Sequence, residues 1–157
     1  MNIITNKIIE LLRENLAEPR NIKRFYYGNP TELASVDLPC IFVQPIRKSV
    51  EQLDNVYDQM ICNFLIGVCV DPAKYQRKGT DEGTATRFLM EIEGGRDSDN
   101  NPIETSVTYV MRNHFTLENT VVYQEQETVF GERELTGGVA KEIHLYFTVK
   151  VKIKNTS

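Results

Sequence analysis

Two histidines and three cysteines are the residues of this sequence best suited to nucleophilic, acid–base or metal chemistry. His114 and His144 have no serine, cysteine or carboxylate at a spacing that would indicate a catalytic triad or a metal site. The cysteines, Cys40, Cys62 and Cys69, lack the CxxC spacing of metal and redox motifs. Because Cys62 and Cys69 lie seven positions apart on one predicted strand, their side chains should point to opposite faces. We therefore expect buried, reduced thiols, hydrogen-bonded or polar-face histidines, and a protein that is not an enzyme and uses no cofactor.

A short acidic run is similar to the beginning of a calcium-binding loop. Asp97 and Asp99, with asparagines after them, offer oxygen ligands at alternate positions, as a hard cation requires. The sixth position is Pro102 where that motif needs a glycine, and the twelfth is Thr108 where it needs a bidentate glutamate. We interpret the run as a solvated loop and expect no metal site there.

Acidic residues concentrate in one part of the chain. Between Glu91 and Glu134 there are ten acidic residues and three arginines, a local net charge of −7. Lys150, Lys152 and Lys154 instead alternate along the last predicted strand, which places them on one face. Lysines on a strand protect an edge from unwanted pairing or bind an acidic partner, and the sequence leaves both interpretations open.

The composition is that of a folded domain. The chain has 157 residues, 41% of them hydrophobic and 25% charged, so we expect one α+β domain over residues 1–157 with a single substantial core. A net charge of −4 argues against tight nucleic-acid binding, which usually depends on clustered Lys and Arg. The longest apolar run, Phe64–Val70, is too short to cross a bilayer, so we expect no membrane contact and a cytosolic protein.

Two segments have the period of an amphipathic helix. The first helix is predicted over about residues 3–17, and Pro19 stops it. Its apolar positions are Ile4, Ile8, Leu11, Leu12 and Leu16. In the second, over residues 81–93, a cap is expected at Thr80 or Asp81, and the apolar positions are Ala85, Phe88, Leu89 and Ile92. Each helix should bury one stripe against a sheet.

Short apolar runs and alternating patterns predict the strands, whereas the segment 21–39 has no sustained period. The predicted strands are 40–44, 57–71, 105–116, 120–130 and 139–154. The last is the clearest, because apolar residues from Ile143 to Ile153 alternate with polar ones. The order α-β-β-α-β-β-β predicts an α+β fold with a mainly antiparallel sheet and two helices packed on it.

The long strands have a consequence for assembly. Fifteen extended residues at ~3.3 Å each span ~50 Å, whereas a compact domain of this length is ~40 Å across. Some strands should therefore extend past the core as a hairpin or an exposed edge. Such an edge aggregates unless a defined partner covers it, so the pattern favours a protein that assembles.

The order of these elements resembles that of the tail terminator (tail completion) proteins of long-tailed bacteriophages, over nearly the whole chain. The shared features are a short acidic chain, an amphipathic N-terminal helix, a strand opening with Leu38-Pro39 and continuing to Val43, a long strand from Tyr57 to Asp71, a helix from Asp81 to Glu93, and long C-terminal strands. That family has no signature motif, so the resemblance carries over no catalytic, cofactor or metal residue.

The resemblance implies a homo-oligomeric ring, typically of six subunits, that sits on the finished tail tube, stops its polymerisation and offers a docking surface to the head connector. Such a protein is part of the virion tail or neck and is present in the host cytoplasm during assembly. DNA would pass through without tight binding if Asp97, Asp99 and Glu104 faced the channel, and the alternate lysines of the last strand would be partner contacts. The alternatives are another neck or tail-tube component, and a small ligand-binding α+β protein or enzyme.

Overall fold

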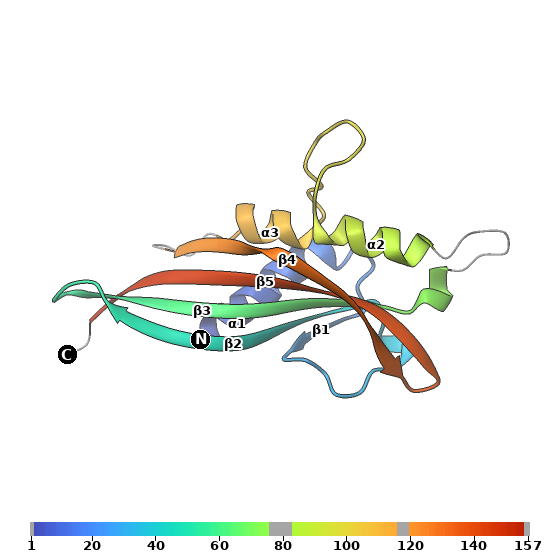
Figure 1. Cartoon of the computed structure of the whole chain (residues 1–157), viewed down its shortest axis with the longest axis horizontal. Coiled ribbons are helices and arrows are strands. Elements are labelled where there is room, and N and C mark those ends of the chain that lie inside the picture. Colours follow the sequence, from blue (N-terminus) through green and yellow to red (C-terminus); the bar gives the residue numbers. More distant parts are fainter. Residues whose placement is uncertain (1, 76–82, 116–119, 156–157) are drawn as a thin grey trace.

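A five-stranded sheet runs the length of the protein in the computed structural model, which describes residues 2–75, 83–115 and 120–155 (Figure 1). The strands lie side by side in the order β1-β2-β3-β5-β4. β1 and β2 pair in parallel, and the other neighbouring pairs are antiparallel. The bounds are Arg24–Tyr27 for β1, Cys40–Gln52 for β2, Tyr57–Val70 for β3, Thr120–Leu135 for β4 and Gly138–Lys154 for β5.

The helices pack against one face of this sheet, and their bounds are Asn2–Leu16 for α1, Gly83–Glu93 for α2 and Val107–Asn113 for α3. Two 3-10 turns, Ser35–Asp37 (η1) and Pro72–Tyr75 (η2), complete the element order. The expected α+β class with a mainly antiparallel sheet is confirmed, with one more helix than predicted. Within the described ranges no helix has the length and apolarity needed to cross a membrane.

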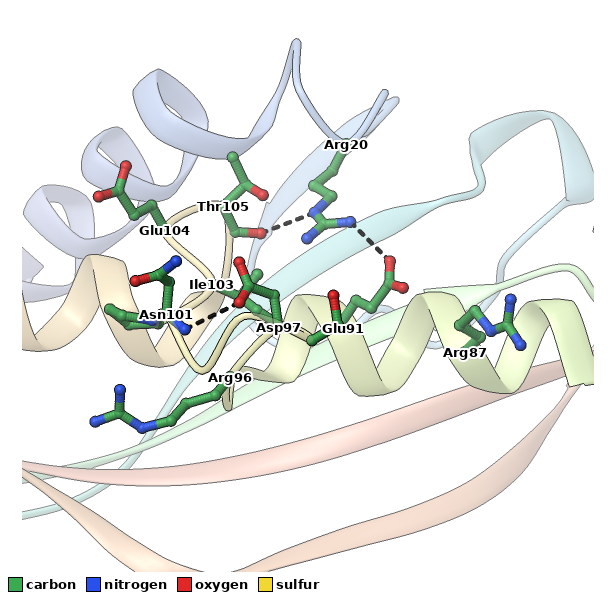
Figure 2. A pocket seen from close by; sticks show the side chains of 11 residues that line it. Arg20, Arg87, Glu91, Arg96, Asp97, Asn101, Ile103, Glu104 and Thr105 are labelled. Carbon is green, nitrogen blue, oxygen red and sulfur yellow. Dashed lines mark hydrogen bonds and ion pairs between the residues drawn. The ribbon is translucent and has the colours of Figure 1, made fainter.

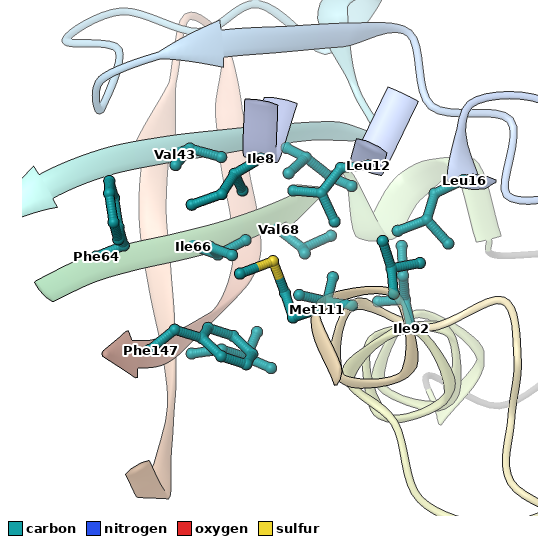
Figure 3. Close-up of a cluster of buried hydrophobic side chains, with 14 of the residues drawn as sticks. Ile8, Leu12, Leu16, Val43, Phe64, Ile66, Val68, Ile92, Met111 and Phe147 are labelled. Carbon is teal, nitrogen blue, oxygen red and sulfur yellow. The ribbon is translucent and has the colours of Figure 1, made fainter. Parts of the chain in front are cut away.

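The main core lies between the helices and the sheet (Figure 3). The buried stripe predicted for α1 is confirmed, and Figure 3 shows Ile8, Leu12 and Leu16 pointing toward the sheet. Ile92 of α2 and Met111 of α3 belong to the same core, with Met111 near its middle and Ile92 close to Leu16 (Figure 3). The strands contribute Val43, Phe64, Ile66, Val68 and Phe147, all of which are buried.

The stripe predicted for α2 is buried except at one position. Ala85, Leu89 and Ile92 are inaccessible, whereas Phe88 is partly buried and packs on Tyr75 of η2 with ring centroids 5.4 Å apart. The predicted cap at Thr80 or Asp81 lies outside the described residues.

A second, smaller core lies on the other face of the sheet. The segment between β1 and β2 folds over the sheet there. Its residues Leu33 and Leu38 cover Phe42 and the two cysteines Cys40 and Cys69, which lie opposite each other on β2 and β3. The residues of this second core are Leu33, Leu38, Cys40, Phe42, Cys69 and Ala140, with Tyr26, Leu65 and Leu135 packed against them. The cover ends at Leu65, and the sheet beyond it toward the β2–β3 turn has no layer on this face within the described residues.

The predicted strand over 105–116 is wrong, because residues 107–113 form α3. Ser106 caps the helix, and its Oγ accepts a hydrogen bond from the Tyr109 N–H at 3.2 Å. The apolar residues Val107, Val110 and Met111 are spaced three and four apart, so one helical face enters the core. The β-branched residues of this segment masked that spacing, and tertiary packing outweighed their strand propensity.

The strand β2 is longer than predicted, and the connection before it is not irregular throughout. Pro45 was expected to end the strand, but a bulge between Pro45 and Arg47 accommodates the missing N–H, and pairing with β3 continues to Gln52. Residues Arg24–Tyr27 of the connection form β1, an edge strand parallel to the start of β2. Strand β4 likewise continues past 130 to Leu135 after a bulge between Gln124 and Thr128.

The expected protruding strands are present. The β2–β3 hairpin extends past the helices at one end of the molecule, and the β4–β5 hairpin bends away from the helices at the other end (Figure 1). The turn of the second hairpin is made by Gly137, whose φ of 87° is one that residues with a side chain rarely adopt. These extensions leave long stretches of strand outside the core.

Candidate functional site

The described part of the sheet has two long edges on which no strand pairs. β4 pairs with β5, and no other strand within the described residues pairs along its opposite side. β1 covers β2 only from Cys40 to Val43, so the outer side of β2 is free from Gln44 to Gln52. Each free edge presents a row of backbone N–H and C=O groups that another strand can bind.

Exposed apolar side chains gather along these two edges and the adjoining hairpin turn. On the β2–β3 side they are Ile46, Val50, Leu53, Val56 and Tyr57, and on the β4–β5 side they are Val121, Tyr123, Val129, Phe130 and Val139. Of the other exposed large apolar residues, Tyr27 ends the edge strand β1, and Ile3, Val36 and Met90 lie outside the strands. Apolar surface concentrated beside unpaired strand edges is typical of an interface rather than of a solvated surface.

The lysines predicted to share one face of the last strand do so. Lys150, Lys152 and Lys154 alternate with Val149, Val151 and Ile153, and they lie on the face opposite the helices. This uncovered area, here called the open face, is the part of the sheet between the second core and the β2–β3 turn. Arg47 of β2 belongs to it as well, because its register partner is Asn63, which is bonded across the open face to Thr148 at 3.2 Å.

Tyrosine rings lie beside the lysines on the open face. The Lys152 Nζ is 4.3 Å from the ring centroid of Tyr57, and the Lys150 Nζ is 5.3 Å from that of Tyr123. Both distances are within the range of cation–π attraction. The sequence did not indicate that Arg47 and the two tyrosines belong to this face. For Arg47 the reason is the bulge after Pro45, which sets the face that its side chain occupies.

The acidic residues proposed from the sequence lie on a loop that projects from the helical side, between α2 and α3 (Figure 1). Asp97 and Glu104 line an open hollow of about 940 Å³ at the base of this loop, and Asp99 lies farther along the same exposed loop. Figure 2 shows Arg20 reaching across the hollow to Glu91 at 3.4 Å and to the Thr105 carbonyl at 2.8 Å.

The geometry of the acidic loop explains its sequence. Asp97 Oδ1 accepts the N–H groups of Asp99 at 3.0 Å and Asn101 at 2.9 Å, so this carboxylate holds the turn closed. A short bridge between Arg96 and Pro102 closes the base of the loop. The similarity to a calcium-binding loop is accounted for by this turn, and the described residues contain no group of ligands arranged for a metal ion.

The two histidines lie apart. His114 caps the C-terminus of α3, which corrects its assignment to a strand, and its ring packs against Tyr109. His144 lies on β5, and its Nε2 is 3.4 Å from Glu142 Oε1. All three cysteines are buried and free, as predicted, and Cys62 and Cys69 point into different cores.

A partly buried ionic cluster, which the sequence did not indicate, lies beside the second core. Glu142 Oε2 accepts hydrogen bonds from Arg133 Nε at 3.0 Å and from Cys69 Sγ at 3.1 Å. Arg133 also donates to the Pro30 carbonyl at 2.7 Å and to Asn29 Oδ1 at 2.6 Å. The cluster therefore ties the β4–β5 hairpin to the segment that covers the second core.

The electrostatics of this cluster favour a charged Glu142 carboxylate and a neutral Cys69 thiol. Burial alone would raise the pKa of Glu142, but the neighbouring His144 and Cys69 and the charge of Arg133 together lower that pKa to about 2. The pKa of Cys69 is raised, first by its hydrogen bond with Cys40 and then by burial. A thiol with a raised pKa is a poor nucleophile.

Acid is expected to weaken the fold through Glu142. Its folded-state pKa of about 2 is below its ordinary value of 4.5, so its stabilising contribution is complete above pH 4.5 and is lost as the pH falls toward 2. The loss should be about 2–3 kcal/mol of unfolding free energy. Urea unfolding at pH 7 and at pH 3 measures it, and Glu142→Gln should shrink the difference between the two. An equal acid loss in the variant would assign the effect to other carboxylates.

A scan of the sequence against protein-family models and a search of curated proteins gave no match. The features on which a function can be proposed are therefore geometric: two free strand edges with apolar side chains, an open face that carries cations, and an acidic loop on the helical side.

Proposed function

We propose that this protein is a structural component of a long-tailed bacteriophage that acts as a tail terminator. In this role it forms a ring, most simply of six subunits, that caps the tail tube, stops its polymerisation and offers the surface to which the head connector docks. The observation that carries the proposal is one sheet with free edges on both sides, β4 and the outer half of β2.

A head-to-tail contact between unlike edges supports a ring. The β4 edge of one subunit can pair with the β2 edge of the next, which leaves the same two edges free for further neighbours. Such an interface either continues as a filament or closes, and closure removes every free edge. The apolar side chains beside both edges would then be buried between subunits.

A ring built this way has two different ends, which suits a protein that joins two different structures. One end meets the last ring of the tube protein, and the other meets the connector. The mechanism is steric, because a subunit whose edges are used within its own ring offers no site for another tube subunit. No reacting group is required, and the protein would act in the virion tail or neck after assembly in the host cytoplasm.

A ring requires that the purified protein has a mass several times 18.0 kDa in light scattering at high concentration. The variant Val129→Lys/Phe130→Lys places two charges beside the β4 edge and should be monomeric, because lysines oppose edge pairing. The matched control is Val36→Lys/Met90→Lys, which replaces two exposed apolar residues away from both edges. The control should assemble like the original protein.

Both variants should unfold within about 0.5 kcal/mol of the original protein, because the replaced side chains are exposed. A monomeric original protein that also fails to bind assembled tail tubes would overturn the ring, and would favour the alternative of a small ligand-binding protein that uses the hollow beside Arg20. Assembly of the β4 variant at the mass of the control would place the interface elsewhere.

A further inference from the structure

The open face of the sheet carries a set of cations that the two-edge ring leaves unused. We propose that this face lines the channel of the ring and contacts the backbone phosphates of duplex DNA through Arg47, Lys150 and Lys152. The inference rests on the proposed ring, because edge-to-edge closure turns one face of every sheet inward. The helices cover the other face. Because the helical layer is bulkier than the sheet, it fits on the outside of the ring, where the circumference is larger.

Register places these cations on the same face of the sheet, Arg47 on β2 and the two lysines on β5, with β3 between them. Arg47 of β2 lies opposite Asn63 of β3, which lies opposite Thr148 of β5. One step toward the β2–β3 turn, Lys150 lies opposite Ile61. The next residue on the same face, Lys152, is about 6.8 Å farther along β5. The cations therefore share one region of the open face, here called the patch, although β3 separates Arg47 from the lysines.

These cations have no ion-pair partner within the described residues. The nearby tyrosines Tyr57 and Tyr123 hold the lysine ammonium groups by cation–π contact without neutralising them. Two carboxylates lie at the turn end of the patch. Glu51 shares a register row with Lys152 through Gln59, and the charge of Lys152 contributes to lowering the pKa of Asp54. The patch keeps a positive balance at Arg47 and Lys150.

The arrangement fits phosphates better than it fits a specific protein partner. Within a ring the patch is repeated by every subunit around a channel, and a repeated polyanion such as duplex DNA can contact all copies at once. The cations that carry the proposal would meet phosphates, which are the same at every base pair, so the contact would be independent of sequence. A few salt-sensitive contacts hold DNA weakly and let it slide.

This orientation assigns the acidic loop to the outside. Asp97, Asp99 and Glu104 project from the helical side, away from the open face (Figure 1). In the ring proposed here they lie on the outer surface or at one end, where they are available to the connector or the tube.

The experiment measures fluorescence anisotropy of a labelled duplex of mixed sequence as the protein is added, beginning at about 50 mM salt and repeated at rising salt. The original protein should bind weakly, with affinity that falls as salt rises. Lys150→Gln/Lys152→Gln should lower the slope of log affinity against log salt by about two. The matched control Lys48→Gln/Arg87→Gln removes the same charge from exposed residues on the helical side and should keep the original slope.

Each outcome decides the proposal. Absence of DNA binding at the lowest salt, or an equal loss in both double variants, overturns it. Binding of polyglutamate in place of DNA, lost in the lysine variant, would assign the open face to an acidic protein partner and would also overturn it. Light scattering on the same samples separates this test from the ring: a ring that does not bind DNA overturns only the lining, and a monomer that binds DNA through these lysines overturns only the ring.

Discussion

Replacing Gly67 with alanine is expected to destabilise the protein by about 3 kcal/mol, or to prevent folding, because the added methyl group has no space. A Cβ at this position would lie 2.1 Å from Cζ and 2.2 Å from Cε1 of Phe42, whose ring lies across the β3 backbone. Phe42 cannot yield easily, since it is fully buried, packs edge-on against His144 at 5.9 Å and lies beneath the Arg133 guanidinium.

Gly131→Ala is the matched control for this prediction. Gly131 also lies in a strand of the same sheet, but a Cβ there would meet no atom within 4 Å. Its unfolding free energy should stay the same or rise by a few tenths of a kcal/mol, because alanine restricts the unfolded chain more than glycine does. Urea unfolding of both variants by circular dichroism measures the difference. A Gly67→Ala protein as stable as the control would mean that Phe42 does not occupy the place described.

Arg133→Met is expected to cost about 3 kcal/mol, the lower end of the effect of breaking a buried ion pair, because Glu142 is buried but Arg133 keeps some contact with solvent. The change leaves the Glu142 carboxylate buried without its counter-ion and releases the Pro30 carbonyl and Asn29. The methionine keeps most of the packing volume over Phe42, so the loss reports on charge and hydrogen bonding.

Two further variants give this prediction its controls. Arg24→Met removes the exposed ion pair with Asp37, whose atoms are 3.6 Å apart, and should cost no more than about 1 kcal/mol. Arg133→Met/Glu142→Met removes both buried charges and should be more stable than Arg133→Met alone. A double variant that is less stable than the single one would show that the carboxylate is satisfied by Cys69 and His144 without the arginine.

Several features of the fold could be predicted because their causes are local. The stripe on α1 repeats with the helical period, and the alternation along β5 continues over the whole strand, so both elements and their buried faces followed from spacing alone. The segment that became α3 shows where this reasoning fails. Its residues suit a strand, and the helix is favoured instead by the burial of one face, by the cap at Ser106 and by the Thr108 Oγ1 hydrogen bond to the Glu93 carbonyl at 2.6 Å.

The candidate sites divide in the same way. Alternation on β5 was enough to place Lys150, Lys152 and Lys154 on one face, because a strand has a period of two whatever surrounds it. The tertiary structure decided the rest. The helices pack on the opposite face and so leave the lysine face open, and the bulge after Pro45 places Arg47 on it. The ionic cluster of Arg133 and Glu142 was hidden for a related reason, since its value comes from burial, and burial is created only when the segment before β2 folds over the sheet.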